Sequence, residues 1–151
     1  MSLLPKIGAL LRRCELAQSR CEQALAQLAR RDADLEREIA AMKSQQDGMR
    51  QLLLAQRPDG EVMARDELFA WQRTQAVLRH RMQDLDFQMD RLREARGEVR
   101  QEQEAQTTLR KSWLRKEDKY QRWARTQRRL RRLEMLSREE SELEERTKWA
   151  S

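Results

Sequence analysis

Glycine, proline and aromatic residues are scarce in this chain. Its 151 residues include four Gly, two Pro and 5% aromatic residues, whereas 38% are charged. So few large apolar side chains argue against a compact globular core, and the abundance of Ala, Leu, Glu, Gln, Arg and Lys is typical of long helices. Disorder is the alternative, and the periodicity of the apolar residues must decide between the two.

Cysteine, histidine and long apolar runs are equally sparse. Cys14 and Cys21 lie seven residues apart, about 10 Å on a helix, which is too far for a disulfide within the chain. His80 is the only histidine, so no zinc site or other cofactor is expected, and two unpaired thiols suit a reducing cytoplasm. The apolar start of the chain is interrupted by Pro5 and Lys6, and we therefore expect neither a signal peptide nor membrane insertion.

Sequence motifs for catalysis are also missing. The chain contains no Walker sequence, Gly-rich phosphate loop, Ser-His-Asp set or paired Cys motif. Its acidic residues fit the solvated flanks of a coiled coil, and a pair of helices offers no deep pocket that could desolvate a reacting group. We therefore predict that the chain is not an enzyme and has no catalytic residues.

A heptad repeat occupies the first third of the chain. Every seventh residue is apolar over seven repeats, which at 38% apolar composition has a chance of roughly one in a thousand per frame. These residues are Ile7, Cys14, Cys21, Leu28, Leu35, Met42 and Met49. The companion positions alternate between apolar Leu11, Leu25, Ile39 and Leu53 and polar Gln18, Asp32 and Gln46. This periodicity favours a coiled coil over disorder.

A second heptad frame follows a strong turn signal. Its members are Trp71, Leu78, Leu85, Leu92, Val99, Gln106, Trp113 and Tyr120, supported by Leu68, Met82, Met89, Leu109, Trp123 and Leu130. The turn signal is the Pro58-Asp59-Gly60 segment after Arg57. We predict an all-α fold: one antiparallel coiled-coil hairpin over residues 1–151, with helices at about 4–55 and 62–147 joined by a turn at about 56–61.

The predicted helices differ in length. Folding back at residue 59 lets the N-terminus reach only to about residue 115, so Tyr120 and Trp123 are expected to overhang without an intramolecular partner. Most of the basic segment 110–132, with eleven Lys or Arg against Glu117 and Asp118, overhangs as well. A helix with an unpaired apolar stripe needs another chain, and the positive charge favours a partner with an acidic surface.

Two groups of residues are candidates for contacts with partners. Trp113, Tyr120 and Trp123 either pack as seam residues against the first helix or, together with the neighbouring cations, anchor a partner. The second group lies on outward heptad positions of the second helix and includes Phe69 and Phe87. Outward Phe side chains suggest a docking face, although isolated exposed apolar residues are common.

Four segments of the chain form a recognisable set: Ile7–Cys14, Cys21-Glu22, Trp113-Leu114-Arg115-Lys116-Glu117 and Tyr120-Gln121-Arg122-Trp123. They resemble the InvI and SpaM group of type III secretion proteins, with YscO and flagellar FliJ as more distant relatives. The resemblance covers essentially the whole chain. It implies a central stalk, similar to the coiled coil of the rotary ATP synthase gamma subunit, whose termini-bearing end inserts into a hexameric secretion ATPase and promotes its assembly and activity. The implied ATPase-binding residues are Ile7, Leu11, Arg12, Arg13, Trp113, Arg115, Lys116, Tyr120, Arg122 and Trp123.

The resemblance further implies a contact with the export-gate protein and a position in the cytoplasm, peripheral to the inner-membrane export apparatus. Phe69, Ala76 and His80 have the spacing of the FliJ contact set, whereas Arg73 stands where an apolar residue is expected; Phe87 extends the same face.

Two other functions stay open. One is escort of secretion chaperones through this face. The other is nucleic-acid binding through the basic helix 110–132, against which the Glu residues between 134 and 145 argue.

Overall fold

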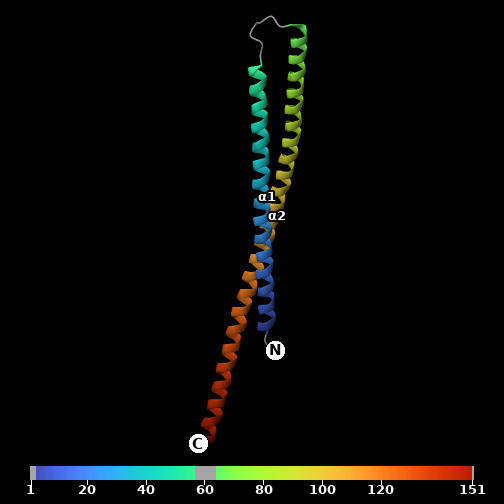
Figure 1. The fold of residues 1–151 in the computed structure, drawn as a ribbon. Coiled ribbons are helices and arrows are strands. Elements are labelled where there is room, and N and C mark those ends of the chain that lie inside the picture. The colour runs from blue at the N-terminus through green and yellow to red at the C-terminus, as the bar shows by residue number, and fades with distance from the viewer. Residues whose placement is uncertain (1–2, 57–63, 151) are drawn as a thin grey trace. The chain divides into compact units, whose positions relative to one another are not determined.

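The described part of the chain forms two long helices (Figure 1). The computed structural model describes residues 3–56 and 64–150. Helix α1 spans Leu4–Ala55 and helix α2 spans Arg65–Ala150, and the described residues contain no strand. The predicted all-α fold of two long helices is therefore confirmed. The predicted turn at Arg57-Pro58-Asp59-Gly60 lies outside the described residues.

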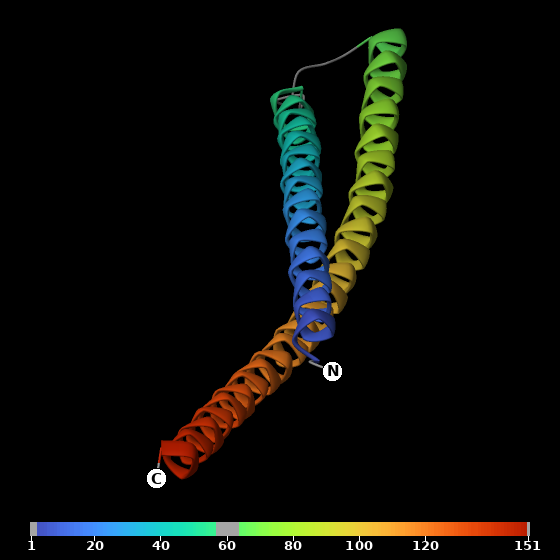
Figure 2. The same ribbon diagram turned by 90° about the horizontal axis from the view of Figure 1, so that it is seen from below.

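Local sequence explains why these helices form. Pro5 lies in the first turn of α1, where its missing N–H costs no helical hydrogen bond. Helix α2 has Asp66 and Glu67 in its first turn and Lys148 in its last, so these charges complement the helix dipole. Neither helix contains an internal proline. Both therefore run without a break through the described residues (Figure 2).

The chain divides into two compact units, and each contains a stretch of both helices. The terminal unit comprises Met1–Leu25 and Ala105–Ser151, and the central unit comprises Ala26–Glu104. Within each unit the heptad residues of α1 face α2. Ile7, Cys14 and Cys21 are buried in the terminal unit, and Leu35 is fully buried in the central unit, where Met89 and Val99 of α2 are also buried. The apolar stripe read from the sequence of α1 is thus the packed face.

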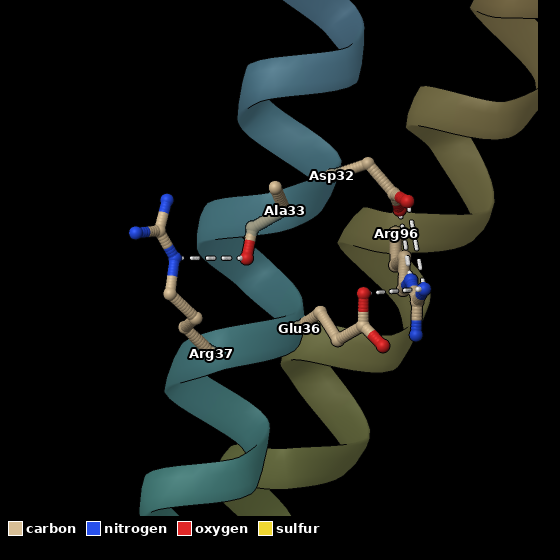
Figure 3. A network of polar contacts seen from close by, with 5 residues as sticks. All are labelled: Asp32, Ala33, Glu36, Arg37 and Arg96. Atoms are coloured by element: carbon tan, nitrogen blue, oxygen red, sulfur yellow. Dashed lines mark hydrogen bonds and ion pairs between the residues drawn. The ribbon is translucent and has the colours of Figure 1, made fainter.

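In the central unit, polar residues at companion heptad positions find partners on α2. Arg96 donates from Nε to Asp32 Oδ1 at 2.8 Å, and its Nη2 lies 3.5 Å from Glu36 Oε2 (Figure 3). Gln46 is buried and donates from Nε2 to the Met82 carbonyl at 3.1 Å. The step from Asp32 to Gln46 runs fourteen residues forward along α1. The step between their partners, from Arg96 to Met82, runs fourteen residues backward along α2. The two helices are antiparallel, and these polar pairs favour one register because any slip leaves buried polar groups without partners.

Asp32 is expected to make the stability of the chain depend on acid pH. The hydrogen bond from Arg96 lowers the pKa of the Asp32 carboxyl below its ordinary value near 3.8, and the guanidinium charge adds to this effect. Since the folded state holds this proton less tightly than the unfolded state, the stabilisation is complete above that ordinary value and is lost as the pH falls from it through the lower pKa of the folded state. Urea unfolding across this range should show the loss in the wild-type chain but not in Asp32→Asn. Asp34→Asn, which changes an exposed carboxylate on the same helix, should keep it. Equal acid dependence in the wild-type chain and Asp32→Asn would contradict the assignment.

Candidate partner-binding surfaces

In the terminal unit, the first turns of α1 pack on α2 between residues 106 and 124. Ile7, Cys14 and Cys21 are buried on α1 and Ala124 is buried on α2. Around this core, Gln18 donates to Glu117, and Arg110 Nη2 lies 3.0 Å from Glu22 Oε1. The unit therefore has its own apolar seam, with polar contacts along its edges.

The overhang of α2 begins later than the sequence predicted. The equal-arm fold would place residue 22 beside residue 96 and end the pairing near residue 115, but Glu22 meets Arg110. Ala124 is only 6% exposed and Gln127 is half-buried, whereas every described residue from Arg128 onward is exposed. The prediction that Tyr120 overhangs is wrong, because Tyr120 is half-buried in the terminal unit.

The central unit gives the physical reason for this difference. The indole Nε1 of Trp71 donates to the Gln56 carbonyl, next to the end of α1. The pairing of the two helices therefore starts at Trp71 and not at the first residue of α2. The residues of α2 before Trp71, from Arg65 to Ala70, are all exposed. The prediction assumed that both helices pair symmetrically about residue 59. In the structure a stretch of α2 precedes the paired region, which shifts the pairing along α2.

The three aromatic residues near the basic segment have different surroundings. Trp113 and Tyr120 are half-buried and line a shallow groove together with Leu10, Arg13, Cys14 and Lys116. Trp123 is 47% exposed, and its neighbour Ala124 occupies the buried position instead. Trp123 is therefore not a seam residue. The same correction applies to Leu68, Leu109 and Leu130, all of which are exposed although the sequence placed them in support of the second frame.

Lysine side chains lie over two tryptophan rings of the terminal unit. Lys116 Nζ lies 4.5 Å from the centre of the Trp113 ring, and Lys119 Nζ lies 4.9 Å from the centre of the Trp123 ring. The centres of the Tyr120 and Trp123 rings are 5.7 Å apart. Arg122 Nη2 lies 2.9 Å from Asp118 Oδ2. The contacts of Trp113 and Trp123 place basic side chains directly on aromatic rings along α2. Aromatic and Arg side chains are enriched at protein interfaces.

The remaining ATPase-binding candidates fall into two groups. Arg12, Arg13, Arg115, Lys116 and Arg122 are exposed, so a partner can reach them directly. Ile7 is buried and Leu11 is half-buried, so these two side chains support the packing of the helices. The heptad pattern had already placed Ile7 and Leu11 on the packed face of the first helix, and it was the resemblance that added them to the ATPase-binding set.

Cys14 belongs to the packing group as well. Its thiol is fully buried, burial raises its pKa, and the neighbouring Glu117 carboxylate raises it further. A protonated, buried thiol is a weak nucleophile and behaves as a small apolar side chain. We therefore interpret Cys14 as a seam residue of the terminal unit.

The second candidate surface lies at the start of α2, in the central unit. Phe69, Arg73 and Ala76 line a shallow groove with Asp66 and Gln72, and the Arg65 guanidinium lies 5.9 Å from the centre of the Phe69 ring. His80 and Phe87 are exposed but lie outside this groove, and His80 Nε2 is 3.6 Å from Asp84 Oδ2. The structure thus brings together three of the five predicted residues. Leu52, Leu54 and Val77 are further exposed apolar residues, and no motif in the sequence distinguishes them.

The described residues hold no group of His, Cys, Asp and Glu side chains that could bind a metal ion. A helix apolar enough over a sufficient length to cross the bilayer is likewise absent from residues 3–56 and 64–150.

The fold and these surfaces define an all-α coiled-coil protein with antiparallel helices and an exposed, basic and aromatic terminal surface. The family model described as Salmonella surface presentation of antigen gene type M protein matches residues 5–147. The chain belongs to this family, which associates it with type III secretion and confirms the resemblance read from its Trp and Tyr segments. No curated protein and no solved structure matches the chain significantly.

Proposed function

We propose that this protein is the central stalk of a type III secretion ATPase complex. Its terminal unit inserts into the hexameric ATPase, promotes ring assembly and hydrolysis, and acts by contact alone, without catalysis of its own. The start of α2 contacts the export-gate protein, so the stalk links the two at the cytoplasmic side of the export apparatus. Secretion chaperones, the other partners that the resemblance implies, would use the face around Phe69.

The observation that carries the proposal is the surface around Trp123. An aromatic side chain 47% exposed lies among basic residues on the unit that bears both chain termini. Large aromatic and Arg side chains dominate the binding energy of protein interfaces. Eleven basic residues between 110 and 132 against two acidic ones favour an acidic cavity over a neutral one.

The proposal is tested by adding the purified chain to the secretion ATPase of its own system. We expect a rise in ATP hydrolysis and in the fraction of hexamer, measured by a coupled assay and by analytical ultracentrifugation. A double variant, Arg115→Glu with Arg122→Glu, should reduce both effects because it reverses exposed charges of the terminal unit. Arg37→Glu, a charge reversal on the exposed face of the central unit, is the matched control. No effect of the wild-type chain on hydrolysis or assembly would exclude the stalk function.

The contact with the export gate is tested by Phe69→Asp. Because Phe69 is 47% exposed, the substitution should leave the helices folded, while a charge on an apolar contact should weaken capture of the gate protein at least tenfold. Leu52→Asp is the control, since Leu52 has a similar exposure but lies on α1, outside the proposed face. Equal capture by both variants and the wild-type chain would show that the gate does not bind this face.

A further inference from the structure

The end of α2 has no helix beside it within the terminal unit. All residues from Arg128 to Ala150, here called the tail segment, are exposed. In Figures 1 and 2 this stretch, coloured orange to red, continues alone past the first residues of α1. Most of the stability of helices in proteins comes from packing of an amphipathic face, and this stretch has no such packing within the terminal unit.

The tail segment presents an apolar stripe. Its members are Leu130, Leu133, Leu136 and Leu143, each about half-exposed. Steps of three and seven residues place these side chains on one side of a helix. The stripe covers less than half of the helix circumference and is flanked by charged residues, as in an amphipathic helix that packs against a neighbour.

The charges of the tail segment are separated along its length. The first part, residues 128–137, carries four arginines against the single carboxylate of Glu134, and the second part, residues 138–150, carries five glutamates against Arg138, Arg146 and Lys148. The arginines are Arg128, Arg129, Arg131 and Arg132, and the glutamates are Glu139, Glu140, Glu142, Glu144 and Glu145. Arg128, Arg129 and Arg132 have no carboxylate three or four residues away on their own helix, and Glu139 and Glu140 have no cation at that spacing. Pairing within the helix therefore leaves most of these charges uncompensated.

We propose that two copies of this chain associate through their tail segments, side by side and antiparallel. A two-fold axis near Leu136 brings the arginines of each copy beside the glutamates of the other, and it covers both leucine stripes at once. A parallel pair would place like charges together, which is unfavourable. The interface of two short helices is small, so we expect a weak dimer that forms in the micromolar range. This proposal concerns the free chain and does not depend on the stalk function.

The experiment uses two charge-reversed versions of the full chain. In the basic version Glu139, Glu140 and Glu142 are changed to Lys; in the acidic version Arg128, Arg129, Arg131 and Arg132 are changed to Glu. Sedimentation equilibrium of the wild-type chain should move from 18.2 kDa toward twice that mass as the concentration rises. Each version alone should stay monomeric over the same range, because its tail repels a second copy, and an equimolar mixture should regain the dimer. All substituted side chains are exposed, so circular dichroism should report unchanged helix content.

The orientation is tested by cysteine substitutions in the tail segment. Ser137→Cys lies next to the proposed axis and should cross-link two copies under mild oxidation, whereas Ala150→Cys should not. A wild-type chain that stays monomeric at high concentration would overturn the proposal, and so would versions that dimerise alone as well as the wild-type chain does. Cross-linking through Ala150→Cys at least as fast as through Ser137→Cys would overturn the antiparallel arrangement.

Discussion

The Trp123→Ala variant is expected to keep the stability of the wild-type chain and to bind the secretion ATPase about thirty-fold more weakly, the equivalent of about 2 kcal/mol for an interface anchor. The Trp123 side chain lies off the seam, with the Lys119 ammonium 4.9 Å from its ring centre. Its removal therefore costs little packing, within about 1 kcal/mol in the free energy of unfolding. Equilibrium urea unfolding and a binding titration with the ATPase measure the two quantities separately.

Trp113→Ala provides the matched comparison. Trp113 is half-buried in the groove with Leu10 and Cys14, so its removal leaves a cavity in the terminal unit and should cost about 3 kcal/mol of unfolding free energy. The two substitutions should thus affect different quantities. Trp113→Ala should lower mainly the free energy of unfolding, and Trp123→Ala should lower mainly the affinity for the ATPase. Unchanged ATPase affinity in Trp123→Ala would remove this residue from the proposed interface, even if the stalk function is otherwise supported.

Leu35→Ala is expected to lower the free energy of unfolding by about 2–5 kcal/mol. The Leu35 side chain is 0% exposed, the deepest position of the α1 seam in the central unit. Its truncation removes apolar contacts that a pair of helices cannot easily restore, since there is no further layer of side chains to move into the cavity. Urea unfolding followed by circular dichroism measures the loss.

Leu16→Ala is the control for Leu35→Ala. Leu16 is the same residue type on the same helix but is 62% exposed, so its truncation should change the free energy of unfolding by no more than about 0.5 kcal/mol. Similar losses for the two variants would mean that the heptad frame through Leu35 is not the packed face.

Much of the architecture follows from the sequence because it rests on local chemistry. The seven-residue spacing through Ile7, Cys14, Cys21 and Leu35 gave the buried face of α1, and these residues are buried. The polar companion positions were read only as interruptions of the seam, yet Asp32 and Gln46 meet partners on α2. Pairing of this kind depends on which residue of the other helix lies opposite, and a heptad pattern does not give this register.

The candidate surfaces were also predicted only in part by the sequence. The sequence selected Phe69, Arg73 and Ala76 as one outward face, and they line one groove because residues three, four and seven apart share a side of a helix. It also selected Trp113, Tyr120 and Trp123 together, although their surroundings differ. Trp123 and Ala124 are neighbours in the chain, and either fits a heptad frame. Only the contact with α1 decides which one is buried.

By itself, then, the amino-acid sequence determined that the chain forms two long helices, which side of α1 is packed, and which family the chain belongs to. These properties depend on residues a few positions apart, where periodicity, propensity and motif spacing act. The tertiary structure alone decided the register of α1 against α2, with Glu22 beside Arg110 and Asp32 beside Arg96, and hence the residue at which α2 becomes exposed. That register is set by the matching of apolar and polar side chains between segments far apart in the chain, which no single stretch of sequence contains.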